Sequence, residues 1–182
     1  AMFHQMVDRQ LHCLTGLRQV IAGGETLSPT FARRFLDGVP EATLINGYGP
    51  TENTTFSCSY AMTHGSEIGE TVLIGTPIRD SQAYILDDNM HPLPIGATGE
   101  LYLGGRGVVQ GYLNDPEQTA QRFVVDPFNL DPHARLYRSG DLGRYMPDGN
   151  IEFLGRTDTQ VKLRGFRIEL GEIETVLREF AN

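Results

Sequence analysis

The sequence predicts an α+β protein that begins with an α/β part and continues with a β-rich part. Strand, helix and strand patterns follow one another within the first 61 residues, which is typical of a β-α-β sheet. Short strands then alternate with turn residues, which is typical of a β-barrel or a distorted sheet. We therefore divide the chain into an α/β region at 1–61, a β-rich region at 62–157 and a further small unit at 158–182.

Composition excludes several classes of function. The chain has 182 residues, enough for one good core, and its formal charge of -8 argues against nucleic acid or an anionic membrane as a partner. No apolar run approaches the roughly 20 residues that span a bilayer, and no leader opens the chain. We therefore expect a cytoplasmic protein. Cys13 and Cys58 show no metal-ligand spacing, so we expect two buried thiols.

Glycine and proline residues mark the ends of the first expected strand and the start of the first expected helix after it. Residues 17–22 are expected to form a strand that ends at the glycine turn 23–25. Ser28 and Pro29 suit the start of a helix, because a serine side chain caps free backbone amides and proline fits the first turn. Residues 42–45 are expected to form the next strand.

The stretch Asn46–Glu52 follows that strand and carries the first chemical groups. Tyr48 offers a flat face for a nucleobase, Thr51 a hydroxyl for a phosphate oxygen and Glu52 a hard oxygen ligand for Mg²⁺. Because ligands bind at the carboxyl ends of parallel strands, this stretch and the turn 23–25 would share one cleft. The alternative is a tight turn with a half-buried tyrosine and two ordinary strand exits.

The β-rich region has its own signals. We expect a short helix from Asp115 to about Phe123, and strands or hairpins at 83–86, 100–103 and 144–154. The glycine-rich stretch 105–111 misses the spacing of a dinucleotide fingerprint by one residue and opens no long helix, so we expect structural turns there.

Two later stretches carry charged groups. Asp141 follows a glycine and could accept both hydroxyls of a ribose, or it could be an ordinary turn aspartate. Residues 155–174 are expected to form a basic strand pair with Gly165 at its turn, followed by a helix with acidic residues in its first turn. Taken alone, this stretch is a solvated charged hairpin.

Four ordered motifs give the chain a resemblance that covers nearly its whole length. The stretches 46–56, 99–113, 137–142 and 155–174 resemble the adenylate-forming superfamily, in particular the amino-acid-activating adenylation domains of nonribosomal peptide synthetases. The resemblance implies that ATP and Mg²⁺ activate an amino acid, and that the acyl group passes to the phosphopantetheine thiol of a carrier protein. Carrier-protein and condensation domains of the same synthetase would be the partners.

The resemblance also assigns roles to residues. The catalytic pair would be Thr51, on phosphate, and Glu52, on the metal. The nucleotide would be bound by Gly24, Asn46, Tyr48, Asp141, Phe153 and Arg156. Among these, Tyr48 would stack on adenine, and Asp141 and Arg156 would hold the ribose. Asp158 would be the hinge about which a mobile carboxyl-terminal lid swings.

Part of the substrate pocket would be formed by Ile21, Gly23, Gly47, Thr55 and Phe56, a set that resembles valine-activating domains. Its isoleucine and phenylalanine make an apolar wall, and its glycines leave room for a side chain. One methylene separates valine from isoleucine by only about 1–3 kcal/mol, so some activation of other branched amino acids is expected.

The family's phosphate loop and ammonium-binding aspartate belong upstream, and its lysine belongs downstream. We therefore expect a piece of a longer polypeptide that is inactive or nearly so by itself. Two rival interpretations stay open. One is a ligase of the same fold for an aryl acid, a fatty acyl group or D-alanine. The other is a non-catalytic nucleotide-binding module, against which the intact Glu52, Asp141 and Arg156 argue.

Overall fold

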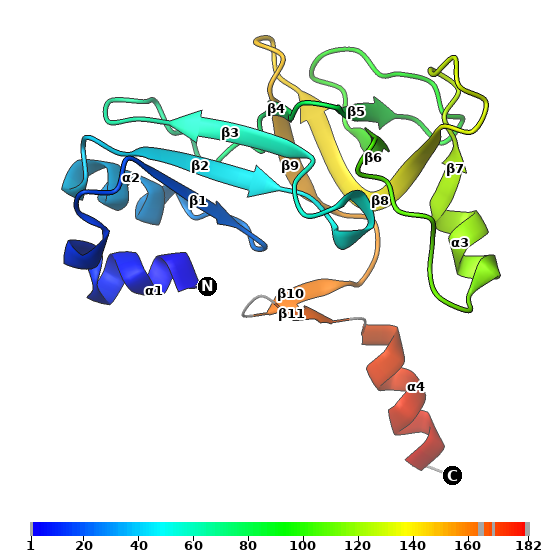
Figure 1. The fold of residues 1–182 in the computed structure, drawn as a ribbon. Helices are drawn as coiled ribbons and strands as arrows, with labels where there is room; N and C mark the ends of the chain where they lie inside the picture. Colours follow the sequence, from blue (N-terminus) through cyan, green and yellow to red (C-terminus); the bar gives the residue numbers. More distant parts are fainter. Residues whose placement is uncertain (1, 164–165, 169, 181–182) are drawn as a thin grey trace.

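The computed structural model describes residues 2–163, 166–168 and 170–180 (Figure 1). Two sheets stand next to each other, and a hairpin and a helix form the end of the chain. This mixed architecture confirms the predicted α+β class. Within the described residues, no helix is both long enough and apolar enough to cross a membrane.

The first sheet has the strand order β1-β2-β3-β4. Its strands are β1 (Gln19–Gly23), β2 (Thr43–Tyr48), β3 (Cys58–Met62) and β4 (Thr76–Pro77). Strands β1 and β2 are parallel and are connected by helix α2 (Pro29–Gly38), so the predicted β-α-β unit is confirmed. Strand β2 continues through Asn46 to Tyr48, beyond the predicted strand end, because these residues pair with the antiparallel strand β3.

One face of this sheet is covered by α2 and by helix α1 (Met2–Arg9), which the short 3₁₀ turn η1 (Leu11–Leu14) follows (Figure 1). The two helices meet through the rings of Phe3 and Phe35, whose centroids lie 5.5 Å apart. Val7, Phe35 and Leu44 are fully buried between the helices and the sheet. This buried packing holds both helices against the sheet.

The start of α2 differs in one detail from the prediction. Pro29 occupies the first turn as expected, and Ser28 is the N-cap. Within the described part of the chain, however, the Ser28 hydroxyl makes no capping hydrogen bond. Instead the Ser28 amide donates to His4 Nε2 at 3.2 Å, and its carbonyl accepts from Ala32 at 3.0 Å. The predicted side-chain cap was therefore wrong.

The second sheet is antiparallel and curls into a half-barrel (Figure 1). Its strand order is β5-β6-β8-β7, with β9 also paired to β8. The strands are β5 (Ser81–Leu86), β6 (Gly99–Gly105), β7 (Phe123–Val125), β8 (Arg135–Tyr145) and β9 (Ile151–Arg156). The predicted hairpin at 144–154 is confirmed by the pairing of β8 with β9. Helix α3 (Pro116–Arg122) is capped by Asp115, whose carboxylate accepts from the Gln118 amide at 2.9 Å.

The two sheets are joined at Gly75. The Ile74 amide donates to the carbonyl of Ile151 at 2.9 Å, and the Ile151 amide donates to the carbonyl of Gly75 at 2.8 Å. Gly75 has a positive φ of 82°, and a Cβ atom there would lie 1.9 Å from the Ser59 carbonyl oxygen. Only glycine therefore fits this junction. Since β4 belongs to the first sheet, that sheet extends past residue 61, and the proposed division at 61/62 stays a prediction.

The chain ends in the antiparallel hairpin β10 (Val161–Leu163) and β11 (Phe166–Ile168), followed by helix α4 (Leu170–Phe180). This order confirms the predicted strand pair and helix, whereas the predicted turn at Gly165 lies outside the described residues. The prediction for the cysteines was half wrong. Cys58 is buried, and burial raises the pKa of its thiol to about 12, but Cys13 in η1 is exposed.

Candidate functional site

A cleft of about 450 Å³ opens where the carboxyl ends of β1 and β2 face strands β8 and β9. Its lining comes from five separate parts of the chain, because the junction at Gly75 holds the two sheets beside each other. All six residues predicted to bind the nucleotide line this cleft: Gly24, Asn46, Tyr48, Asp141, Phe153 and Arg156. The structure thus brings together residues that lie far apart in the sequence.

Asp141 reaches the cleft from an irregularity in β8. The register between β6 and β8 shifts between Glu100 and Tyr102, so the segment Ser139–Asp141 bulges out of regular pairing. The Ser139 hydroxyl donates to the Leu101 carbonyl at 2.6 Å and accepts from the Asp141 amide at 3.0 Å. This bulge fixes the Asp141 carboxylate at the cleft, where it is 6% exposed.

Tyr48, at the end of β2, lies against both Asp141 and Phe153. Its hydroxyl donates a hydrogen bond to Asp141 Oδ2, and its ring centroid lies 6.4 Å from that of Phe153. Burial, followed by the nearby Asp141 carboxylate, raises the Tyr48 pKa well above its usual value. The phenol therefore stays protonated, and the two rings form an aromatic wall of the cleft.

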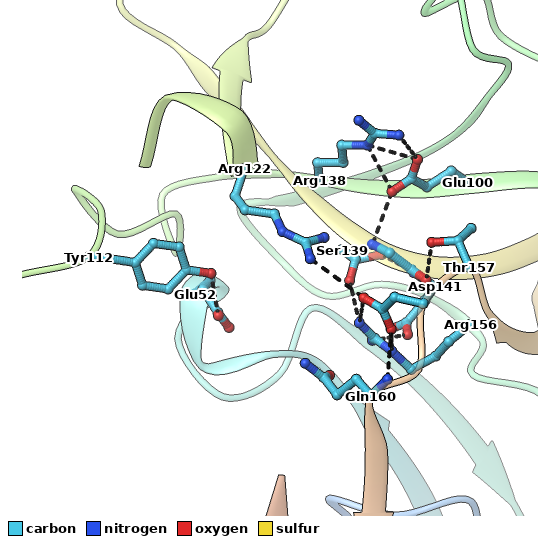
Figure 2. A network of polar contacts seen from close by, with 12 residues as sticks. Glu52, Glu100, Tyr112, Arg122, Arg138, Ser139, Asp141, Arg156, Thr157 and Gln160 are labelled. Carbon is cyan, nitrogen blue, oxygen red and sulfur yellow. Dashed lines mark hydrogen bonds and ion pairs between the residues drawn. The ribbon is translucent and has the colours of Figure 1, made fainter. Parts of the chain in front are cut away.

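Arg156, at the end of β9, bridges two carboxylates (Figure 2). Its Nη1 donates to Asp141 Oδ1, while Nε and Nη2 donate to the two oxygens of Asp158 at 2.7 and 2.8 Å. Burial opposes the charge on Arg156, but the hydrogen bonds to Asp158 and the charge of Asp141 outweigh it and raise its pKa. The Arg156 guanidinium is therefore a fixed positive charge that connects Asp141 at the cleft with Asp158 at the exit from β9.

Asp158, the predicted hinge, is held at the exit from β9. Besides Arg156, its carboxylate faces Arg122 of α3 at 3.5 Å and accepts from the Gln160 amide at 3.2 Å. The hydrogen bonds from Arg156 lower the Asp158 pKa. Asp158 is thus tied to the same arginine as Asp141, a connection that the sequence did not reveal.

Thr51 and Glu52, the predicted catalytic pair, lie in the short 3₁₀ turn η2 (Thr51–Asn53). Thr51 lines a smaller space of about 160 Å³ that adjoins the main cleft and shares Tyr48, Asp141 and Arg156 with it. Glu52 is 5% exposed and points away from Arg156, toward the hydroxyl of Tyr112 (Figure 2). The structure therefore places Thr51 at the cleft and Glu52 directly behind it.

The donor set around Glu52 fits Mg²⁺ only in part. Among the described residues, no group of three or more His, Cys, Asp or Glu side chains could hold a metal ion by itself. Mg²⁺ is commonly bound by one or two carboxylates together with substrate phosphates, and Glu52 is one such carboxylate, next to Thr51. Protein residues alone do not complete this site, which is consistent with a metal that arrives with a nucleotide.

The predicted substrate residues lie near the free face of the first sheet. Ile21 and Gly23 alternate with core residues of β1, and Gly23 pairs in register with Gly47. The Phe56 ring covers both glycines, since a Cβ at Gly23 or Gly47 would lie 2.7 or 2.6 Å from its Cε1 atom. The room expected above these glycines is therefore filled by Phe56, and Ile21 is 58% exposed.

Thr55 has the unusual φ of 72° for a threonine and is exposed, so it shapes the loop that carries Phe56.

Two residues at the site were not predicted from the sequence. Arg122 comes from a helix with no motif, and Tyr112 directly follows the stretch 105–111 that we interpreted as structural turns. One sequence signal could have identified Tyr112. It is a large aromatic residue at the end of a glycine-rich loop, and a buried tyrosine hydroxyl usually has a hydrogen-bond partner.

Comparison with known proteins adds independent findings. The model of a protein family described as AMP-binding enzyme matches residues 1–113. Over 180 residues the chain is 52% identical to tyrocidine synthase 3 of Brevibacillus parabrevis, and this match covers 99% of the chain. It is also 52% identical to surfactin synthase subunit 2 of Bacillus subtilis (strain 168), over 97% of the chain. The chain spans 3% and 5% of these two relatives.

Solved structures agree with these relatives. The fold matches PA1221, an NRPS protein containing adenylation and PCP domains, with a TM-score of 0.89 and 39% identity. That match covers 97% of this chain and 36% of the solved one. The Klebsiella oxytoca NpsA N-terminal subdomain, solved in complex with 3-hydroxybenzoyl-AMSN, matches 85% of this chain and 39% of its own, with a TM-score of 0.77 and 29% identity.

Proposed function

Since the chain belongs to the AMP-binding enzymes and, within them, to the adenylation domains of nonribosomal peptide synthetases, we propose that it supplies much of the nucleotide site for activating an amino acid as its adenylate. One observation carries this proposal. The six residues expected to bind a nucleotide come from stretches far apart in the sequence, yet all of them line one cleft.

In this proposal the cleft binds ATP through groups that are already positioned. Tyr48 and Phe153 offer the aromatic surface for adenine. A carboxylate has about four lone-pair sites, so Asp141 can accept from ribose hydroxyls while it still accepts from Tyr48 and Arg156. Thr51 offers its hydroxyl to a phosphate oxygen from the adjoining space. These groups orient the α-phosphate for attack by a carboxylate.

Glu52 would hold Mg²⁺ together with phosphate oxygens of the nucleotide. The bound metal would neutralise the phosphate charge, which is the chemistry that such ions supply in phosphoryl and nucleotidyl transfer. The protein's part is to keep Glu52 in the turn directly after Thr51, so that the phosphate-binding hydroxyl and the carboxylate move as one unit.

Valine is the proposed substrate, because the apolar set Ile21, Gly23, Gly47 and Phe56 resembles the one in valine-activating domains. We expect valine to give the highest rate of ATP–pyrophosphate exchange in the complete domain that carries this sequence. Isoleucine and leucine should be slower by roughly 10- to 200-fold, the discrimination that one methylene allows. The assay compares all proteinogenic amino acids, with the 182-residue chain alongside, which we expect to be nearly inactive. Exchange led by a polar or charged amino acid would contradict the valine assignment.

A second candidate substrate class is an aryl acid. The solved Klebsiella oxytoca subdomain carries 3-hydroxybenzoyl-AMSN, and it shares this fold at 29% identity. The two peptide synthetases are much closer in sequence, each at 52% identity, which favours an amino acid. Exchange with hydroxybenzoates and with no amino acid would reverse this order.

The acyl group would then pass to the phosphopantetheine thiol of a carrier-protein domain. This step is supported by the similarity to PA1221, which contains adenylation and PCP domains, and by the peptide synthetases among the relatives. A condensation domain would be a further partner in the same synthetase. A location in the cytoplasm stays a prediction.

Asp158 is proposed as the hinge between adenylate formation and thiol loading. Asp158→Pro would restrict φ at the exit from β9, so we expect thiol loading to fall at least about 10-fold while exchange stays within about 3-fold. Loading is measured as radiolabelled amino acid on the carrier protein, and exchange is measured in the same preparation. Asp158→Ala is the control, because it removes the contacts to Arg156 without restricting the backbone. Equal loss of both activities in the proline variant would argue against a hinge.

A further inference from the structure

The smaller space of about 160 Å³ that adjoins the main cleft is suited to one group of a ligand. Pockets that hold a whole drug-sized ligand measure roughly 300–1,000 Å³. The space shares Tyr48, Asp141 and Arg156 with the main cleft, and Thr51 and Gln160 belong to its own lining. With adenine in the main cleft and the ribose on Asp141, as proposed, the phosphates are the part of a nucleotide left for the smaller space.

Gln160 lies directly before β10 and is 6% exposed, so its side chain faces the protein rather than solvent. It lies beside Arg156 at the smaller space (Figure 2). Its backbone amide donates to Asp158 Oδ1 at 3.2 Å, so the position of Gln160 follows that of the proposed hinge. A glutamine side chain has two N–H donors and one carbonyl acceptor. It can therefore add a phosphate oxygen to the contacts that it already makes.

The donors around the smaller space come from separate parts of the chain. The Ser139 hydroxyl already donates to the Leu101 carbonyl at 2.6 Å. A hydroxyl has a single hydrogen to donate, so Ser139 has none left for a phosphate oxygen. Thr51 offers a hydroxyl from the turn η2, and Gln160 offers amide N–H groups from the segment after β9. One phosphate could therefore bind donors from both segments.

The charges beside the smaller space are balanced. Asp141 is paired with Arg156. Asp158 lies 2.7 Å from Arg156 Nε and 3.5 Å from Arg122 Nη2. In the part of the chain that the structure describes, these contacts set two carboxylates against two guanidinium groups. A phosphate that enters the space therefore meets no net negative charge, and the neutral amide of Gln160 adds none.

We propose that Gln160 is a phosphate-binding residue of the nucleotide site, which donates from its side-chain amide to a phosphate oxygen in the smaller space beside Thr51. This inference rests on the proposed nucleotide site and adds a contact from beyond Asp158. Rotation about the proposed hinge would carry Gln160 away from Thr51, so phosphate binding depends on the setting of the hinge. A glutamine that only supports the fold would not distinguish a nucleotide from a nucleoside.

The test compares adenosine, AMP and ATP as ligands of the complete domain, because adenosine has the same base and ribose but no phosphate. Gln160→Glu keeps the size of the side chain and adds a negative charge, whereas Gln160→Met removes the donors without adding charge. The matched control is Gln118→Glu, the same change at an exposed position of α3. Dissociation constants are measured by saturation-transfer difference NMR, which detects weak ligands, without divalent cations, so that metal binding does not contribute.

We expect Gln160→Met to weaken AMP and ATP by roughly 10-fold, the loss of a hydrogen bond to a charged group, and Gln160→Glu to weaken them further. Adenosine should change by less than about 2-fold in both variants, because it lacks the phosphate that the lost donor would bind. Gln118→Glu should change none of the three. Weakening of ATP alone would place the contact at the β- or γ-phosphate. Equal effects on all three ligands, or no effect on AMP and ATP, would overturn the proposal.

The wild-type titrations separate this inference from the proposed function. Should the wild-type domain bind the ligands but exchange no carboxylic acid, the proposed activation would be wrong while the titrations would still test Gln160. Should it bind adenosine, AMP and ATP equally well, the smaller space would hold no phosphate, and the role of Gln160 would be refuted although the nucleotide cleft stands. Should it bind none of them, both proposals would be refuted.

Discussion

Asp141→Ala is expected to lower ATP–pyrophosphate exchange in the complete domain by at least about 100-fold, because it removes charge-assisted hydrogen bonds to the ribose worth about 1.5–3 kcal/mol each. It also leaves the Tyr48 hydroxyl without its acceptor and Arg156 with Asp158 as its remaining carboxylate. The side chains of Arg156 and Asp141 are only 14% and 9% exposed, so the fold should lose about 2–4 kcal/mol as well.

The two effects of Asp141→Ala can be measured separately. Exchange kinetics report the loss of nucleotide binding, and urea denaturation reports stability. Asp141→Asn keeps the shape and removes the charge, so it should retain more stability than alanine but little more activity. The control is Asp8→Ala, which breaks the exposed pair between Arg34 and Asp8 at 2.9 Å and should cost below about 1 kcal/mol. Full exchange activity in Asp141→Asn would refute the ribose role.

Gly75→Ala is expected to be the most damaging small substitution in the fold. A methyl group there would sit 1.9 Å from the Ser59 carbonyl oxygen, in a backbone conformation with φ of 82°. Because the neighbouring groups are backbone atoms of β3, they cannot move aside without breaking the junction between the sheets. We expect a loss of more than about 4 kcal/mol, or no folded protein at all.

Gly149→Ala is the matched control for this prediction. Gly149 has nearly the same φ, 84°, but nothing lies within 4 Å of its added Cβ. Its substitution should therefore cost only the intrinsic penalty of a left-handed residue, about 1–2 kcal/mol. Urea denaturation of both variants in the complete domain, followed by circular dichroism, compares them. Similar midpoints for the two variants would mean that the backbone contact at Ser59 is not what requires glycine at position 75.

Local signals in the sequence predicted the local elements correctly. The apolar runs around Val20 and Leu44, with glycines after each strand and Pro29 between them, predicted the parallel β-α-β unit. The turn at Pro147–Asn150 predicted the hairpin of β8 and β9. In each case the residues that determine the element lie within a few positions of it, so sequence spacing is sufficient.

Pairings between distant segments were not predicted. Strand β4 consists only of Thr76 and Pro77, and it is defined by its partner β3 rather than by any pattern of its own. Strand β3 follows β2 only after residues 49–57, a connection longer than the two to five residues typical of a hairpin. The junction of Ile74 and Gly75 with Ile151 likewise depends on which segments meet in space, and hydrophobic periodicity does not carry that information.

At the candidate site, too, the residues were predicted from the sequence, but the contacts between distant residues were not. Family motifs identified the six residues around the cleft, because motifs keep functional residues at fixed positions. They did not predict that Phe56 fills the space over Gly23 and Gly47, or that Arg156 binds Asp158 as well as Asp141. Nor did they connect Tyr112 with Glu52. These contacts depend on side-chain directions, which follow from the assembled fold.

The junction at Gly75 also has a consequence for biosynthesis. A ribosome releases the chain from its amino end, so the β-α-β unit can assemble its core of Val7, Phe35 and Leu44 early. The strand that begins at Ile151 leaves the ribosome much later, and until then Ile74 and Gly75 have no partner strand. The nascent chain therefore exposes the edge of its first sheet while the residues between Gly75 and Ile151 are being synthesised. A pause in translation between the two segments would prolong the interval in which that edge is open to wrong pairing.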